Sequence, residues 1–348
     1  MNMKKLLSLV LALALCLALA ACGGTQNAGN TPGASNTPST NDTPSANDAP
    51  SANDAQAATF TVGICQLVQH PALDAATKGF RDALEAAMPG QITFDEQNAN
   101  NDIPTCATIV NGFVASKVDL ILANATPALQ AAAAATQEIP VLGTAITEYG
   151  VALDLPNFDG TVGGNISGTA DLAPLDQQAA IFDEVLPNVS KIGILYCSAE
   201  ANSVYQANVV KAALESAGKT VTVYTFADSN DVVTVTSQAC SENEALYIPT
   251  DNTAASSVEA INNVAEPAGV PIVAGEESIC GGCGIATLSI DYYELGRTTG
   301  AMVAKILKGE SQVSEMPIEY YQNPVKKYNP ALCEAHGITI PDGYEAIA

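Results

Sequence analysis

The sequence predicts an α/β protein of two Rossmann-like lobes, each a parallel sheet flanked by helices, joined by a hinge of several strands. The first observation is a repeated strand-loop-helix unit: TVGICQLVQHPALDAATKGFRDALEAA at 61–87 matches KIGILYCSAEANSVYQANVVKAALESA at 191–217. Gly63 falls on Gly193, 130 positions later (193 minus 63), with no gap before Leu84 falls on Leu214. The second is that strand and helix patterns alternate along the chain, which favours parallel sheets covered on both faces. The third is the length of 348 residues, which suits two lobes better than one.

The same order of elements is expected in each half of the chain. Residues 61–87 combine an apolar strand, a polar turn and a helix with apolar residues at helical spacing. Further strands are expected at 91–94, 118–122 and 139–142, a helix at 104–115, and an Ala-rich helix starting within 123–127. The corresponding strands of the second half are 221–226, 245–248 and 270–273. Asp119 to Ala245 spans 126 positions and Ile139 to Val270 spans 131, offsets that a chance similarity would hardly maintain.

The first 58 residues are expected to lie outside both lobes. Lys4 and Lys5 precede an apolar run at 6–21 that ends in small residues before Cys22, the pattern of a lipoprotein signal peptide. A membrane-spanning helix is the alternative, but the run of about 16 residues falls short of the ~20 that a span needs. We expect residues 1–21 to be removed, Cys22 to carry a lipid such as palmitate, and the polar stretch at 22–58 to be a disordered tether.

Charge and cysteine content exclude several classes of function. A formal net charge of −24 repels phosphate backbones, so no nucleic-acid partner is expected. Beyond Cys22, an odd number of cysteines remains, which is not a complete disulfide framework. Cys280 and Cys283 form the only CxxC motif, and a redox motif, half of a metal site, a local disulfide and two free thiols all remain open. With His70 and His336 as the only histidines, no metal site and no cofactor are expected.

Candidate ligand-binding residues follow the predicted strands. In open α/β sheets, ligands bind just beyond the carboxyl ends of the strands, and two such edges facing each other would enclose a small molecule. His70 precedes a proline and is expected to close its loop, not to bind or catalyse. The candidates are Gln66, Asn124, Thr126 and Thr147 in the first half and Ser198, Glu200, Asp251, Asn252 and Glu276 in the second.

Three crossings between the lobes are expected, at 164–171, near Ile290 and Asp291, and within 316–321. This gives an N-terminal lobe of residues 59–165 and 292–315 and a C-terminal lobe of residues 166–291 and 316–348. Asp291 with Glu294 three residues later reads as a capping box, so Asp291 is expected to start a helix instead of binding a ligand.

Several segments resemble a known family. GICQLVQHPALDAATKGF, VDLILANATPALQAA, LYCSAEANS, ALYIPTDNT and DYYELGRTTGAMVAKILKGE are similar to the ABC transporter substrate-binding lipoproteins of the tryptophan/tyrosine type. The resemblance extends over nearly all of the chain from Thr59 onward and implies the type I periplasmic-binding-protein fold. It also implies an extracytoplasmic, lipid-anchored protein that captures one amino acid, usually aromatic, and passes it to an ABC permease. Thr147 and Glu148 stand where the family would have a Thr-Asp-Pro turn, and the loop around Cys283 has no match.

An amino-acid ligand needs a partner for each of its charged groups, because desolvation must be compensated. Its carboxylate suits backbone N–H groups and a hydroxyl at a helix N-terminus, which the stretch from Asn124 to Thr126 supplies. Its ammonium needs an anion, for which Asp251 is the first choice and Glu200 or Glu276 the next. A capping role for Thr126 and a turn-forming role for Asn252 are the structural alternatives.

Other functions remain as alternatives within the same fold. A sugar- or nucleoside-binding protein is possible, although a chain without Trp offers few flat platforms for sugars. A lipid-anchored sensor that presents its ligand-bound form to a receptor would look the same in sequence. An enzyme is not expected, because no GxSxG, HExxH or glycine-rich phosphate loop is present.

Overall fold

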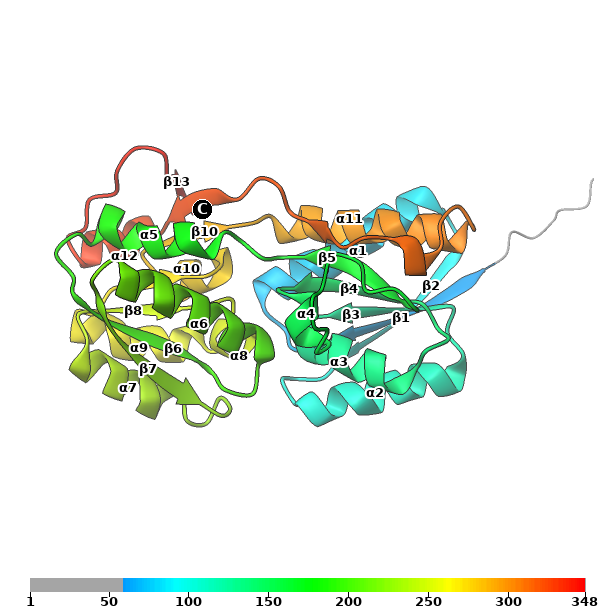
Figure 1. Ribbon diagram of the computed structural model, residues 1–348, viewed down its shortest axis with the longest axis horizontal. Coiled ribbons are helices and arrows are strands. Elements are labelled where there is room, and N and C mark those ends of the chain that lie inside the picture. The colour runs from blue at the N-terminus through cyan, green and yellow to red at the C-terminus, as the bar shows by residue number, and fades with distance from the viewer. Residues whose placement is uncertain (1–58, 348) are drawn as a thin grey trace, which may run out of the picture. The chain divides into compact units, whose positions relative to one another are not determined.

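The computed structural model describes residues 59–347. The signal peptide expected at 1–21, the lipidation site expected at Cys22 and the tether expected at 22–58 lie outside the described residues. Between residues 59 and 347, no helix has both the length and the apolar character needed to cross a membrane. This part of the chain folds into two sheets of mainly parallel strands flanked by helices, which confirms the predicted α/β class (Figure 1).

The N-terminal sheet has six parallel strands in the order β11-β5-β4-β3-β1-β2. Its strands are β1 (Phe60–Gln66), β2 (Ile92–Asn98), β3 (Leu120–Asn124), β4 (Val141–Ile146), β5 (Ile166–Ala170) and β11 (Glu319–Tyr320). The helices around it are α1 (Pro71–Ala87), α2 (Ile103–Ser116), α3 (Thr126–Ala135), α4 (Tyr149–Ala152), α11 (Tyr292–Leu307) and the 3-10 helix η1 (Val313–Glu315). In Figure 1, α1 and α11 cover one face of this sheet, and α2 and α3 cover the other.

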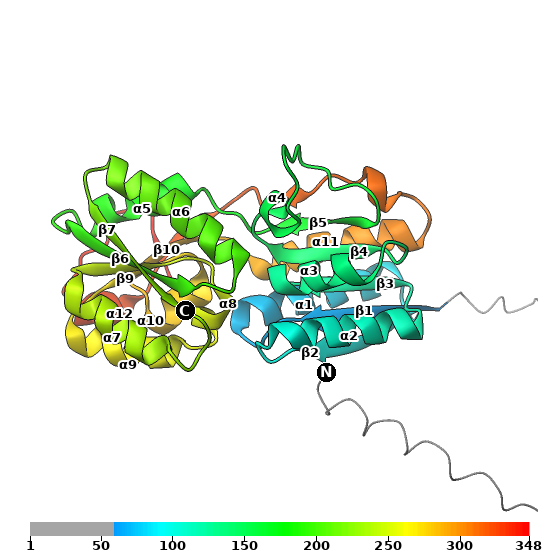
Figure 2. The same ribbon diagram turned by 60° about the horizontal axis from the view of Figure 1, so that its bottom comes forward.

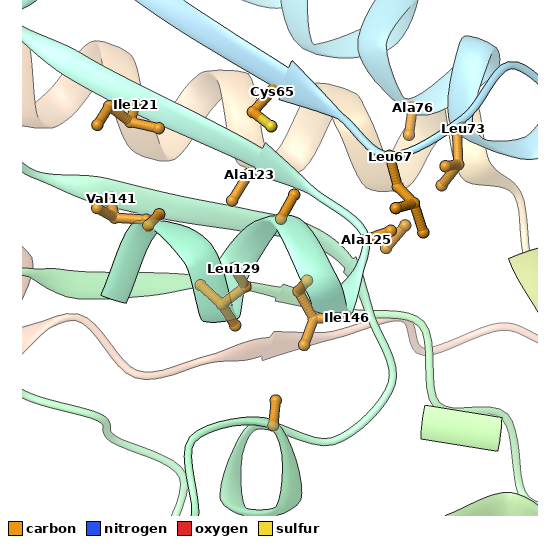
Figure 3. Packing of buried hydrophobic residues seen from close by; sticks show 14 of the residues in the cluster. Cys65, Leu67, Leu73, Ala76, Ile121, Ala123, Ala125, Leu129, Val141 and Ile146 are labelled. Carbon is orange, nitrogen blue, oxygen red and sulfur yellow. The ribbon is translucent and has the colours of Figure 1, made fainter. Parts of the chain in front are cut away.

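Side chains of the N-terminal sheet divide between these two faces. Val62 and Ile64 of β1 pack in the cluster that contains Phe80 of α1. The alternate residue Cys65 belongs to the opposite cluster, together with Leu129 of α3 (Figure 3). Both faces of the strands are therefore buried, which explains why the strands read as continuous apolar runs in the sequence.

The C-terminal sheet has seven strands in the order β13-β12-β10-β9-β8-β6-β7, and only the β10-β12 pair is antiparallel. Its strands are β6 (Lys191–Cys197), β7 (Thr220–Phe226), β8 (Ala245–Ile248), β9 (Ile272–Ala274), β10 (Ala286–Ser289), β12 (Val325–Tyr328) and β13 (Glu345–Ala346). Its helices are α5 (Leu175–Val185), α6 (Ala201–Ser216), α7 (Val232–Glu242), α8 (Asn252–Ala255), α9 (Val258–Ala268), α10 (Glu277–Cys283) and α12 (Pro330–Ala335). Helices α5 and α6 lie on one face of the sheet, with α7 and α9 on the other (Figure 2).

The repeat predicted from the sequence is present in the strand order. Strands β2-β1-β3-β4-β5 and β7-β6-β8-β9-β10 follow one another in the same spatial order, so each half of the chain builds the same five-stranded unit. The matched glycines mark close packing in both copies. A Cβ atom at Gly63 would lie 2.7 Å from the Phe113 ring, and one at Gly193 would lie 2.7 Å from Leu246.

The crossings fall a few residues beyond two of the expected boundaries. The sequence predicts residues 166–170 and 316–320 in the C-terminal lobe, but β5 and β11 pair with each other in the N-terminal sheet. Pairing between strands far apart in the sequence decides this boundary, and neither strand's own residues carry that information. We therefore propose an N-terminal lobe of 59–170 and 292–320, with the C-terminal lobe formed by the remaining described residues.

Helix α11 returns from the C-terminal sheet and packs against α1. Asp291 starts α11 by accepting a hydrogen bond from the Glu294 backbone N–H at 3.0 Å, as the capping box predicted. Gly79 and Gly296 bring the two helices together, because a methyl group at Gly296 would collide with the backbone of Ala76. This contact holds the second crossing beside the start of α1.

Candidate functional site

The predicted binding residues lie at the carboxyl edges of the two sheets. Gln66 and Asn124 end β1 and β3, and Asp251 and Glu276 follow β8 and β9. Hydrogen bonds join the two edges: His70 Nε2 lies 3.3 Å from Asn252 Oδ1. The structure therefore brings these residues of both halves to one region, as the sequence predicted.

Gln66 is engaged within its own lobe. Its Nε2 donates to the Val68 carbonyl at 2.9 Å and to Asp74 Oδ1 at 2.7 Å. Its Oε1 accepts from Thr77 Oγ1 at 2.7 Å. These contacts use all the strong hydrogen-bonding positions of Gln66 and hold the start of α1 against β1. Gln66 therefore supports the site without offering a free polar atom to a ligand.

Asn124 and Thr126 stand at the start of α3. The Asn124 amide nitrogen donates to the Leu73 carbonyl and to Thr77 Oγ1, both at 2.9 Å. Its Oδ1 is buried without a hydrogen-bond partner in the described structure. The helix N-cap is Ala125, which has a φ of 87° and no side-chain cap. Because a positive φ is strained for alanine, the local structure must hold this turn in place. Thr126 is thus the buried first residue of the helix and not its cap.

Glu200 is the most heavily hydrogen-bonded carboxylate of the region. Its Oε2 accepts from the Asn252 backbone N–H at 3.1 Å and from Asn252 Nδ2 at 2.6 Å. Its Oε1 accepts from the Thr253 backbone N–H at 2.9 Å and from Thr253 Oγ1 at 2.8 Å. Glu200 therefore fixes the loop that follows β8.

Asp251 and Glu276 serve as helix N-caps. Asp251 Oδ1 accepts from the Ala254 N–H and its Oδ2 from the Cys197 N–H, both at 2.7 Å. Burial raises the pKa of Asp251 to about 8, and the nearby Glu200 charge adds to this rise. Glu276 Oε1 accepts from the Ile279 N–H at 2.7 Å and caps α10. The sequence placed these acids in the region but could not foresee that backbone N–H groups occupy their oxygens.

Ser198 is the exception among the predicted residues. It is exposed, and its hydroxyl donates to the Phe226 carbonyl at the end of β7, 3.2 Å away. The hydroxyl bonds the neighbouring strand because the turn after β6 continues along the edge of the sheet. Ser198 is therefore not gathered with the buried residues.

Asp171 and Tyr292 are residues of the site that sequence reasoning missed. Both lie at crossings between the sheets, and the Tyr292 hydroxyl donates to Asp171 Oδ2 at 2.9 Å. Burial raises the pKa of Asp171 to about 6; the hydrogen bond from Tyr292 opposes this rise, and the Glu276 charge adds to it. Its Oδ1 is buried without a partner in the described structure. The available signal was its position directly after the fifth strand, which we read only as a crossing.

The buried charges of this region are all of one sign. Over residues 59–347, the buried acidic side chains are Asp171, Glu200, Asp251 and Glu276, with exposures between 1% and 5%. No Lys or Arg of the same residues forms an ion pair with any of them. Burying carboxylates without a countercharge is costly, so the region is suited to a cationic group.

A cavity of about 670 Å³ borders this region, and of the four buried acids Glu276 alone lines it. Helix α1 contributes Ala72 and Ala75, the α10 loop contributes Glu276, and the second crossing contributes Ile290 and Tyr292. Its size and its mixture of apolar walls with a few polar groups are typical of sites for small organic molecules.

The thiols do not form a second site. Each described cysteine is free and buried. Cys280 and Cys283 donate to the carbonyls of Gly284 and Ile279, which agrees with two free thiols among the alternatives above. Within 59–347, no group of three His, Cys, Asp or Glu side chains is arranged to hold a metal ion.

Two α/β lobes with facing polar edges define a small-molecule-binding protein. The chain belongs to the ABC transporter substrate binding protein family, whose sequence model matches residues 61–348. This confirms the resemblance noted in the sequence. Such proteins bind a substrate for a transporter and are not enzymes.

Relatives agree with this assignment. A tyrosine-binding protein of Clostridioides difficile (strain R20291) is 37% identical over 263 residues, which cover 74% of this chain and 75% of the relative. An ABC domain in complex with L-Trp from Streptococcus pneumonia is 32% identical and superposes with a TM-score of 0.79, over 83% of this chain and 100% of that one. The ligand-free, open structure of a substrate-binding protein with adhesive properties from Clostridium difficile is 35% identical, with a TM-score of 0.63, over 83% of this chain and 99% of that one.

Proposed function

We propose that this protein captures an aromatic amino acid between its two lobes outside the cytoplasm and delivers it to an ABC permease. The observation that carries the proposal is Asp171, a buried carboxylate that has no basic partner and one oxygen without a hydrogen bond. An amino acid brings an ammonium group that would compensate this carboxylate, whereas a neutral sugar or an anionic ligand would not. Relatives that bind tyrosine or are solved with L-Trp support an aromatic side chain.

The ammonium is assigned to Asp171 in place of Asp251. Asp171 Oδ1 is buried without a partner, whereas both oxygens of Asp251 already accept backbone N–H groups. A charge-assisted hydrogen bond to the ammonium would satisfy the free oxygen and stabilise the ionised form of a carboxylate that burial disfavours. Thr147, which is 2% exposed, is proposed to add a polar side chain to the site.

The carboxylate of the ligand is assigned to the start of α3. The partial positive charge of a helix N-terminus and its free N–H groups favour an anion. Thr126 adds a hydroxyl at the first helical position. The free Asn124 Oδ1 is an acceptor, which suits a donor of the ligand and not its carboxylate.

The remaining predicted residues are proposed to hold the site and not to contact the ligand. Gln66, Glu200, Asp251 and Glu276 use their polar atoms to position α1, the loop after β8 and the starts of α8 and α10. This role follows from the partners of their oxygen and nitrogen atoms.

Calorimetric titration of residues 58–348 tests the proposed ligand class. We expect binding of Trp, Tyr or Phe with a negative heat-capacity change, because an apolar ring is buried. The matched control is 3-(4-hydroxyphenyl)propionate, which keeps the ring and carboxylate of tyrosine and lacks the ammonium. Equal affinity for tyrosine and this analogue would contradict the role of the carboxylates, and binding of a sugar or a nucleoside alone would replace the proposed ligand class.

We further propose that Cys22 anchors the protein to the membrane through a lipid, with the polar stretch at 22–58 giving reach. The support is the signal-peptide pattern that precedes Cys22. Growth with labelled palmitate should label the wild-type protein and not Cys22→Ser. A labelled Cys22→Ser protein would overturn the anchor.

A further inference from the structure

Two pairs of hydrogen-bonded side chains join the lobes near the site. His70 Nε2 lies 3.3 Å from Asn252 Oδ1, and Asn101 Nδ2 donates to Thr253 Oγ1 at 3.1 Å. His70 and Asn101 belong to loops of the N-terminal lobe, and Asn252 and Thr253 begin α8 of the C-terminal lobe. We call these four residues the latch.

Glu200 holds both C-terminal members of the latch. Its two carboxylate oxygens together accept four hydrogen bonds from Asn252 and Thr253, two from backbone N–H groups and two from side chains, at 2.6 to 3.1 Å. The carboxylate is 1% exposed, so water does not compete for these bonds. One buried side chain thus orients both residues that reach the other lobe.

Glu200 also determines which atoms face the N-terminal lobe. A carboxylate can only accept, so the Asn252 amide must turn its NH₂ toward Glu200 and its Oδ1 toward His70. His70 Nε2 must then be the donor, which in the neutral ring leaves Nδ1 as an acceptor. Glu200 therefore determines which atom donates and which atom accepts in the contact between His70 and Asn252.

The arrangement of the lobes is nearer to that of a ligand-bound relative. The chain superposes on the L-Trp complex with a TM-score of 0.79 and on the ligand-free, open structure with 0.63, although the open protein is slightly more similar in sequence. Contacts such as those of the latch form only when the lobes are together.

We infer that Glu200 is a positioning residue that holds the latch and so sets how long the ligand stays bound, without touching the ligand. The inference rests on the proposed function. It differs from a role as ammonium partner, because all the strong accepting positions of Glu200 are used within the protein. In Glu200→Gln, an NH₂ group replaces one carboxylate oxygen and cannot accept the two hydrogen bonds that this oxygen receives. The variant therefore loses the hold on one of the two residues, Asn252 or Thr253.

Dissociation kinetics test the inference. The chain contains no Trp, so the fluorescence of bound L-Trp, excited beyond the absorption band of tyrosine, can be followed without background from protein tryptophan. We expect Glu200→Gln to raise the dissociation rate roughly 10- to 100-fold, the effect of losing charge-assisted hydrogen bonds, and to change the association rate by less than about threefold. Glu215→Gln is the matched control, because Glu215 pairs with Lys211 at 2.7 Å on α6 in the same lobe and is not part of the latch. An unchanged dissociation rate in Glu200→Gln would overturn the inference.

A deaminated ligand separates positioning from direct contact. If Glu200 acts through the latch, Glu200→Gln weakens binding of L-Trp and of indole-3-propionate by the same factor. A loss confined to L-Trp would mean that Glu200 binds the ammonium, which contradicts the inference.

A double-mutant cycle tests whether Glu200 acts through Asn101. Asn101 has a φ of 63°, so Asn101→Gly removes the side chain without backbone strain. The double variant should lose less than the sum of the two single effects. Full additivity would place Glu200 outside the latch.

Hydrogen exchange distinguishes failure of the latch from failure of the proposed ligand. If the wild-type protein binds no aromatic amino acid, the proposed function is wrong. The Asn252 and Thr253 amides donate to Glu200 with or without a ligand, so they should exchange faster in Glu200→Gln. Unchanged exchange at both amides would overturn the hold of Glu200 on the latch.

Discussion

Replacing Asp171 by Asn should stabilise the free protein and weaken ligand binding. Burial raises the Asp171 pKa from 3.8 to about 6, so ionisation at neutral pH opposes folding by about 3 kcal/mol. An Asn side chain keeps an oxygen for the Tyr292 hydroxyl and removes the buried charge. We expect the free energy of unfolding to rise by about 1–3 kcal/mol and the affinity for Trp or Tyr to fall roughly 10- to 100-fold.

Two measurements on one variant check this reasoning. Urea unfolding of the free protein gives the stability, and calorimetric titration gives the affinity. Asp119→Asn is the matched control: it makes the same change at an exposed carboxylate directly before β3, away from the carboxyl edge of the sheet, and it should leave affinity unchanged. The reasoning is refuted if Asp171→Asn binds the amino acid as tightly as the wild type, or if it is destabilised as strongly as a lost buried ion pair.

Three further predictions follow from the same structure. Affinity should fall by about tenfold per pH unit below pH 6, because binding needs ionised Asp171. The free protein should become more stable as the pH falls from 6 toward 4, because the folded state, in which the Asp171 pKa is raised, takes up the proton first. Calorimetric titration at several pH values measures the affinity, and urea unfolding measures the stability. Gly296→Ala should lower the free energy of unfolding by more than about 2 kcal/mol, because its methyl group collides with the Ala76 backbone. At Gly112 a methyl group meets open space, so Gly112→Ala should raise the free energy of unfolding by up to ~1 kcal/mol. The cysteines of residues 58–348 are buried and free, so a thiol reagent should modify them only after unfolding; rapid modification of the native protein would contradict this.

The repeat and the fold class could be read from the residues. Gly63 and Gly193 lie within matched strands, and in each copy a neighbouring side chain packs too closely to leave room for a Cβ atom. The apolar runs and the helical spacing after each strand depend on local sequence alone, and so does the capping box at Asp291. The gathering of polar residues at one edge could also be predicted, because parallel strands share one carboxyl edge.

Which of these residues is free to bind was decided by tertiary structure. Asp251 and Asp171 are both acids that follow a strand, and nothing in their neighbours separates them. Folding gives Asp251 the N–H groups of Cys197 and Ala254, whereas it buries Asp171 with one oxygen unpartnered. The sequence by itself determined the α/β class and the edge at which the polar residues gather, since these follow from local periodicity. Hydrogen-bond partners that are far apart along the chain determined the role of each side chain, because only the packed structure brings them within 3 Å.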